Sequence, residues 1–194
     1  MAIIRGGGEF GPSWHQAAVK EKRQNAFDDF LSVAEDLISN NVTSPGHLGI
    51  MGASNGGLLV GAAFTQQPEL FNAVVCASPV LDMKRYINPL GGDFYKDEFG
   101  DPDNPEDWEY LKEYSPYHNL SPDKVYPEVL FTASMYDMNV HPAHARKMAA
   151  RMEEMGHTVH YYEETEGGHL AEITNERTAY ITAMWYTFLY MKTK

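Results

Sequence analysis

The stretch LGIMGASNGGLL, from Leu48 to Leu59, passes from apolar residues into a glycine-rich turn and back to apolar residues. Its centre, residues 52–56, reads GASNG and fits the pattern G-x-S-x-G. Between a strand and a helix, this pattern makes a tight turn that lifts the serine hydroxyl above the edge of the sheet. Ser54 is therefore the candidate nucleophile, and the backbone amide of Asn55 is the candidate oxyanion donor. A plain turn or a phosphate loop is the alternative, although no Gly-Lys-Ser/Thr follows.

Strand-like and helix-like segments alternate along the chain, and this alternation predicts an α/β fold with a mainly parallel sheet. Asn25 is the expected cap of the first long helix. From Met83 to Val125 the pattern dissolves into Pro, Gly, Asp and Tyr, which predicts an excursion of loops and short helices that carries binding residues. Strands are expected at residues 2–5, 47–51, 73–77, 128–133 and 159–162, and helices at 27–38, 56–64, 145–155 and 175–191.

A serine hydroxyl is a weak nucleophile unless a histidine removes its proton and a carboxylate orients that histidine. Asp137 follows the penultimate predicted strand and His169 follows the last one. Ser54, Asp137 and His169 thus occur in the chain order of α/β-hydrolases, with the acid and the histidine after the expected strands. A turn residue at position 137 and a surface histidine at position 169 are the alternatives.

Composition limits the classes of function. A chain of 194 residues with 43% hydrophobic residues is long enough for one domain, over residues 1–194. Its formal net charge of -12 argues against a nucleic-acid partner, because binding phosphates needs a basic surface. The single cysteine, Cys76, lies in an apolar run and is expected to be a buried hydrophobe and not a reactive thiol. A chain without disulfides suits a cytoplasmic protein.

No metal, cofactor or membrane partner is expected. His141 and His144 lie three residues apart, but no third ligand is in register with them. The N-terminus does not resemble a signal peptide, and no window reaches the ~18 consecutive apolar residues of a membrane helix.

Several further pieces occur in order between Arg5 and His169: RGGGEFGPSWH, FDDF, TSP, GASNGGLL, VLDM, YSPYHN, VHPAHARKM and EGGH. With these pieces the chain resembles the catalytic domain of the prolyl oligopeptidases, which are α/β-hydrolase serine peptidases that usually carry a β-propeller. The resemblance covers nearly the whole chain. It implies cleavage of peptides after proline through an acyl-enzyme on Ser54.

The resemblance also implies a proline-accepting S1 pocket. Val80, Tyr95, Phe99 and Val140 fall where the family builds this pocket, and an apolar aromatic slot suits a pyrrolidine ring. At Asn139 the family usually has an arginine that holds the peptide carbonyl before the proline. This substitution weakens the case for efficient peptide cleavage. A second difference is Leu170, where the family usually has a small residue, and it is expected to narrow the mouth of the site.

Relative to the family, the chain begins at what resembles the fourth strand of the hydrolase sheet. The propeller, the first three strands and the tyrosine that supplies a second oxyanion donor are then absent. Ile3 and Ile4 must pair with the strand before Ser54, pair with another chain, or remain loose. An uncovered strand edge predicts a homo-oligomer. A small ester is the alternative substrate, and a catalytically silent oligomeric module is the alternative to an enzyme.

Overall fold

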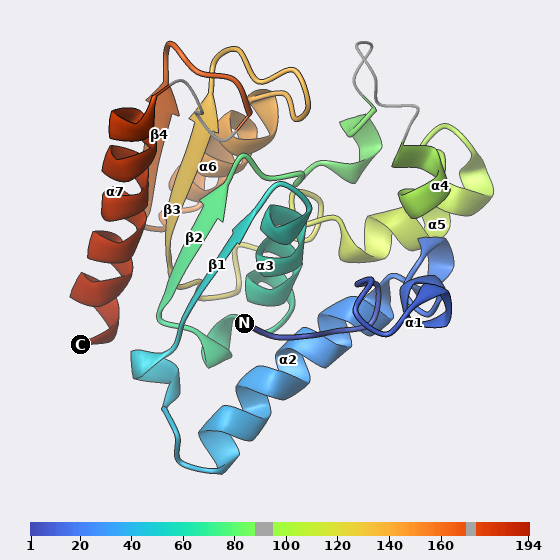
Figure 1. Cartoon of the computed structure of the whole chain (residues 1–194), viewed down its shortest axis with the longest axis horizontal. Coiled ribbons are helices and arrows are strands. Elements are labelled where there is room, and N and C mark those ends of the chain that lie inside the picture. The colour runs from blue at the N-terminus through green and yellow to red at the C-terminus, as the bar shows by residue number, and fades with distance from the viewer. Residues whose placement is uncertain (88–94, 170–173) are drawn as a thin grey trace.

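In the described part of the chain, four parallel strands form one central sheet (Figure 1). The computed structural model describes residues 1–87, 95–169 and 174–194. In spatial order the strands are β1 (Gly49–Ala53), β2 (Ala73–Ala77), β3 (Glu128–Ser134) and β4 (Val159–Glu164). Each strand pairs in parallel with its neighbour, so all four carboxyl ends meet along one edge of the sheet. The expected α/β fold with a mainly parallel sheet is confirmed.

Helices cover both faces of this sheet. In Figure 1, α7 (Asn175–Thr193) lies against one face, while α3 (Asn55–Gln66) and α6 (Ala143–Glu154) lie on the other, and α2 (Gln24–Ser39) packs outside α3. The remaining elements are the short helices α1 (Pro12–Gln16), α4 (Lys96–Phe99) and α5 (Pro105–Tyr114) and the 3-10 turns η1 (Lys20–Lys22), η2 (Pro45–His47), η3 (Pro68–Leu70) and η4 (Met83–Arg85). No helix in the described part of the chain is long and apolar enough to cross a membrane.

The main core lies between the sheet and its helices. β2 reads AVVCA and is buried along its whole length, as expected of a central parallel strand that is covered on both faces. The prediction that Cys76 is a buried hydrophobe is confirmed, and burial raises the pKa of its thiol. A second apolar cluster anchors the excursion after β2 to α2 and α3; it consists of Phe27, Leu58, Ala62, Met83, Tyr86, Phe99, Leu111 and Tyr114.

Two expectations about the N-terminal part are wrong. Residues 2–5 form no strand. The carbonyl of Ile4 accepts a hydrogen bond from the Trp14 indole at 2.7 Å, and Arg5 pairs with Asp29 on α2, with its Nε 2.8 Å from Oδ2. These contacts fix the segment to helices and not to β1. Asn25 is not a cap, because α2 already begins at Gln24 and the Asn25 amide donates to a loop carbonyl.

Candidate active site

Ser54 lies in the turn between β1 and α3, as the motif predicts. Its backbone has φ 57° and ψ -115°, a strained conformation for a residue with a side chain. The turn is held from both sides: the Ser54 amide donates to the carbonyl of Ala77 at 2.9 Å, and the Leu58 amide donates to the Ser54 carbonyl at 3.1 Å. The amide of Asn55 belongs to the first residue of the 12-residue helix α3, where the first four amides have no partner within the helix.

The two glycines of the motif have different roles. A Cβ atom added to Gly52 would lie 2.0 Å from the carbonyl oxygen of Gly56, so only glycine fits where the chain folds back over the end of β1. A Cβ atom added to Gly56 would meet nothing within 4 Å. A further glycine, Gly57, is constrained instead, because an added Cβ would lie 2.6 Å from that of Pro79. The motif therefore needs its first glycine for space, but not its second.

Asp137 and His169 meet at the same edge of the sheet. Nδ1 of His169 lies 2.7 Å from Oδ2 of Asp137, which is 5% exposed. The other carboxylate oxygen accepts the amides of Asn139 at 2.9 Å and Val140 at 2.8 Å. Burial alone would raise the pKa of Asp137, but these three hydrogen bonds hold it below its ordinary value. The ionised carboxylate orients the ring so that Nδ1–H donates and Nε2 is free to accept a proton.

The loop that carries His169 is tied to the end of β3. The buried hydroxyl of Ser134 donates to the carbonyl of Gly167, two residues before the histidine. Glu164 is 1% exposed and accepts the amides of Thr165 at 2.9 Å and Glu166 at 3.2 Å. The Ser134 contact ties the histidine loop to the strand that leads to Asp137, and Glu164 at the end of β4 orders the first residues of the loop. No motif in the sequence marks Ser134 or Glu164 as part of the site.

The nucleophile and the histidine are not yet in hydrogen-bond contact. Within the described ranges, no hydrogen bond joins the Ser54 hydroxyl to His169. Catalytic hydrogen bonds are often long in free enzymes and shorten only when substrate is bound. Leu170, the residue after the histidine, lies outside the described residues.

A pocket opens beside Ser54 and contains every residue that the resemblance assigns to substrate binding. Its cavity of about 20 Å³ is lined by Ser54, Asn55, Val80, Tyr86, Tyr95, Phe99, Asn139, Val140 and His144. Phe99 packs edge-on against Tyr86, with ring centroids 5.5 Å apart. The aromatic wall of the pocket is thus the margin of the second apolar cluster. Tyr86 and His144 also line it, and the sequence alone did not indicate them.

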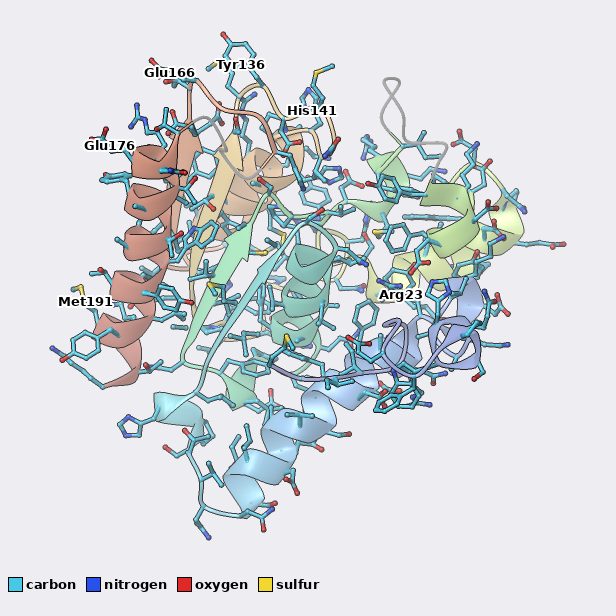
Figure 2. All side chains as sticks on the ribbon, in the orientation of Figure 1. Arg23, Tyr136, His141, Glu166, Glu176 and Met191 are labelled. Carbon is cyan, nitrogen blue, oxygen red and sulfur yellow. The ribbon has the colours of Figure 1, made fainter. Side chains whose placement is uncertain are left out.

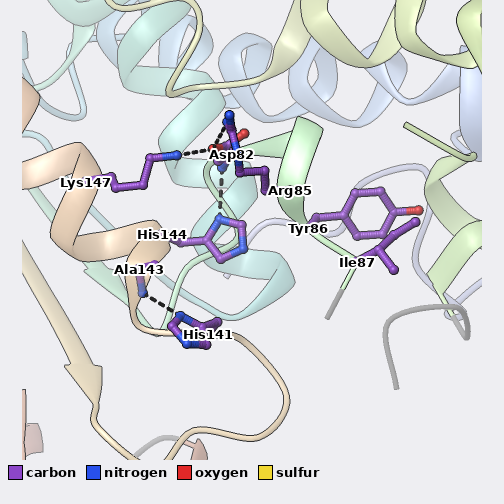
Figure 3. A pocket seen from close by; sticks show the side chains of 8 residues that line it. All are labelled: Asp82, Arg85, Tyr86, Ile87, His141, Ala143, His144 and Lys147. Atoms are coloured by element: carbon purple, nitrogen blue, oxygen red, sulfur yellow. Dashed lines mark hydrogen bonds and ion pairs between the residues drawn. The ribbon is translucent and has the colours of Figure 1, made fainter. Parts of the chain in front are cut away.

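His144 also lines a second, larger pocket (Figure 3). The second cavity has about 200 Å³ and is bordered by Asp82, Arg85, Lys147 and others. The His144 ring is buried, and its Nδ1 accepts the amides of Leu81 at 3.3 Å and Asp82 at 3.0 Å. Burial lowers the pKa of His144 to about 4, so the ring is neutral near pH 7 with its proton on Nε2.

His141 and His144 lie close in sequence but have different surroundings and hydrogen-bond partners. His141 is exposed, and its Nδ1 accepts the amide of Ala143 at 3.1 Å, which caps the start of α6. His144 faces the loop after β2, as described above. Among the described residues, no group of three or more His, Cys, Asp or Glu side chains is arranged to hold a metal ion.

The chain is similar to known proteins along its whole length. A model of the Prolyl oligopeptidase family matches residues 1–194. The uncharacterized peptidase y4nA of Sinorhizobium fredii is 48% identical over 192 residues, which cover 99% of this chain and 26% of that protein. A prolyl endopeptidase of Dictyostelium discoideum is 42% identical over 155 residues, 79% of this chain and 20% of that protein.

Solved structures share the fold as well. The structure of a post-proline cleaving enzyme from Rickettsia typhi superposes with a TM-score of 0.91 at 44% identity, over 98% of this chain and 28% of that one. The chain therefore spans about a quarter of the length of the relatives that it matches. The match over all 194 residues, together with the shared fold, shows that the chain belongs to the prolyl oligopeptidase family.

Proposed function

We propose that the chain carries the catalytic machinery of a serine peptidase that cleaves peptides after proline through an acyl-enzyme on Ser54. The observation that carries the proposal is the 2.7 Å contact between Asp137 and His169, formed at the same edge of the sheet as the strained turn of Ser54. The names of the relatives from Dictyostelium discoideum and Rickettsia typhi, a prolyl endopeptidase and a post-proline cleaving enzyme, support the preference for proline.

Acylation begins when Nε2 of His169 removes the proton from the Ser54 hydroxyl, and Oγ then attacks the carbonyl carbon of the scissile bond. Negative charge develops on the carbonyl oxygen, where the amide of Asn55 at the N-terminus of α3 stabilises it. The protonated His169, held by the Asp137 carboxylate, then gives its proton to the leaving amine. The C–N bond breaks, and the acyl group remains on Ser54.

Deacylation repeats these steps with water. His169 takes a proton from the water molecule, hydroxide attacks the acyl carbon, and the proton returns to Oγ as the ester bond breaks. No metal or cofactor is needed for either half of the reaction. For either half of the reaction the Ser54 hydroxyl and Nε2 of His169 must come within hydrogen-bond distance, a contact that is often made only when substrate is bound.

A fluorophosphonate probe tests the proposal directly. The folded chain should be labelled on Ser54, as mapped by mass spectrometry, and should hydrolyse a glycyl-prolyl amide. Ser54→Ala and His169→Ala should abolish both signals while circular dichroism stays unchanged. Equal labelling of the Ser54→Ala variant would overturn the assignment of the nucleophile. Ester turnover that is lost in His169→Ala would in turn rule out a catalytically silent module.

A second candidate function, hydrolysis of small esters, is favoured by the size of the pocket. A cavity of about 20 Å³ holds roughly one water molecule, so a proline ring enters only if the lining side chains move. Asn139 also gives the site no cation with which to hold a peptide carbonyl. The ratio of kcat/KM for a nitrophenyl acetate to that for a glycyl-prolyl amide decides between esterase and peptidase.

We also propose that the chain self-associates through an edge of its sheet. β1 and β4 each pair with one strand only in the described structure, so each leaves one row of backbone groups without a strand partner. Open edges of this kind favour pairing with another chain. Light scattering should give a mass above 21.9 kDa. A monomer at all concentrations would contradict the proposal.

A further inference from the structure

Behind the Ser54 pocket lies a buried cation that the mechanism above does not use. Arg23 lies at the start of α2 (Figure 2). It is 6% exposed. Its Nη1 lies 2.5 Å from Oε1 of Glu98, and its Nη2 donates to Oδ1 of Asn55 at 2.6 Å. Its guanidinium also lies over the ring of Phe99, 4.9 Å from the centroid. One side chain thus contacts three residues that are distant in sequence.

Two of the three contacted residues line the pocket at Ser54, and the third is the sequence neighbour of one of these two. Asn55 follows the nucleophile, and Phe99 forms part of the aromatic wall. Glu98 is the neighbour of Phe99 on α4, and its second oxygen lies 2.8 Å from Nε2 of His15. Arg23 therefore connects the serine turn to the helix that carries the wall. α4 has only four residues, so it depends on such contacts for its position.

Stability alone does not explain this arrangement. A buried charge rarely adds net stability over apolar residues of the same volume, because it loses its hydration, and here the Arg23 side chain is 7% exposed while that of Glu98 is 23% exposed. The pairing is also incomplete, since Nε of Arg23 is buried and has no hydrogen-bond partner in the described part of the chain. What the planar guanidinium supplies is geometry: a fixed fork that bonds two oxygens while its face packs on a ring.

We propose that Arg23 is a positioning residue for the substrate pocket, and the proposal rests on the function proposed above. Its guanidinium fixes the distance between the Phe99 wall and the Ser54 turn, and this distance determines how well a proline ring is held before the scissile bond. Ligands with a cyclic residue at this position depend on Arg23. Ligands with a small side chain there do not.

Binding to the Ser54→Ala chain tests this idea without any need for catalysis. In that background, Arg23→Met should raise the Kd of a glycyl-prolyl amide about tenfold, because contacts in an apolar pocket are lost. The Kd of a glycyl-alanyl amide should change less than about twofold. Glu98→Gln should also raise the Kd of the glycyl-prolyl amide. Lys22→Met, which changes the exposed neighbour in sequence, is the matched control and should change neither.

In the chain with Ser54 intact, Arg23→Met should raise KM for the prolyl amide by a larger factor than KM for an acetate ester. Equal losses for both ligands, or no loss for either, would overturn the proposal. If Arg23→Met does not fold, Glu98→Gln and Arg23→Lys decide the matter, since a lysine keeps the charge but cannot bond both oxygens in one plane. Failure of fluorophosphonate labelling would count against the proposed chemistry and leave the binding comparison intact.

Discussion

The hydroxyl of Ser134, the last residue of β3, donates to the carbonyl of Gly167 in the loop before His169. This contact makes the strand that leads to Asp137 a support for the histidine as well. Both members of the acid–base pair therefore depend on one strand end, and a change at Ser134 tests the link between fold and chemistry.

Ser134→Ala should lower both stability and activity. The change leaves a buried carbonyl without its donor, which costs roughly 1–3 kcal/mol, and it frees the loop of His169. We expect a lower midpoint in thermal unfolding and slower fluorophosphonate labelling of Ser54. Ser39→Ala, at an exposed serine that ends α2, is the control. Reduced stability with an unchanged labelling rate would show that the contact is structural only.

Asp137→Asn should reduce turnover with little change in KM. An asparagine can still accept the amides of Asn139 and Val140 through Oδ1, but its NH₂ group cannot accept the proton of His169 Nδ1. The ring then adopts the wrong tautomer, a defect that costs about 10⁴ in kcat in serine proteases. Steady-state kinetics on the glycyl-prolyl amide check this. Asp123→Asn, at an exposed acid, should behave as the unchanged chain.

Gly52 and Gly56 form a matched pair for the serine turn. Gly52→Ala places a methyl group 2.0 Å from a backbone oxygen, so the turn must shift, and labelling of Ser54 should be largely lost. Gly56→Ala meets no atom within 4 Å and lies inside α3, where alanine is preferred by up to about 1 kcal/mol. Equal effects of the two substitutions on labelling and melting temperature would contradict this account.

His144 should make stability depend on pH between about 6.5 and 4. Burial lowers the pKa of the His144 ring in the folded chain from 6.5 to about 4. The positive charge of Lys147 and the neighbouring His141 also lower this pKa, while the carboxylates of Asp82 and Asp137 raise it. In this range the unfolded chain binds the extra proton, so the free energy of unfolding falls as the pH falls. The loss over the whole range is about 3 kcal/mol at most.

Urea unfolding at pH 7, 5 and 4 measures this dependence. His144→Asn keeps an acceptor for the amides of Leu81 and Asp82 and removes the titration, so its slope should be flatter. His141→Asn, at the exposed histidine, should keep the original slope. Asp82 and Asp137 have lowered pKa values in the folded chain, so they contribute stability that is lost only at still lower pH. Identical slopes in both variants would assign the effect to other groups.

The sequence predicted the part of the fold that depends on local patterns. The predicted strand at residues 73–77 has the same first and last residues as β2. A short run that is apolar throughout is typical of a central parallel strand that is covered on both faces. Gly156, with φ 85°, ends the region of α6 as predicted. The positions of Ser54, Asp137 and His169 after their strands could be predicted for a similar reason, because the G-x-S-x-G motif and the order of the strands can be recognised from short stretches of sequence.

What was missed depends on contacts between distant segments. Residues 2–5 have a composition typical of a strand, but Arg5 pairs with Asp29 and the Trp14 indole donates to the Ile4 carbonyl. Neither contact can be predicted from the local sequence. Arg23 looks like one more charged residue in a polar stretch until folding places Glu98 beside it. In the sequence, His144 is one of two closely spaced histidines without a third metal ligand, and nothing near it shows that the amides of Leu81 and Asp82 lie against its ring.

Cys76 provides an internal reporter for all of these experiments. It is the single cysteine of the chain, it lies in the middle of the sheet, and its thiol is fully enclosed. A thiol-specific dye can therefore react only when the sheet opens. The rate of that reaction separates variants that have lost a catalytic contact from those that have begun to come apart, without any label being introduced.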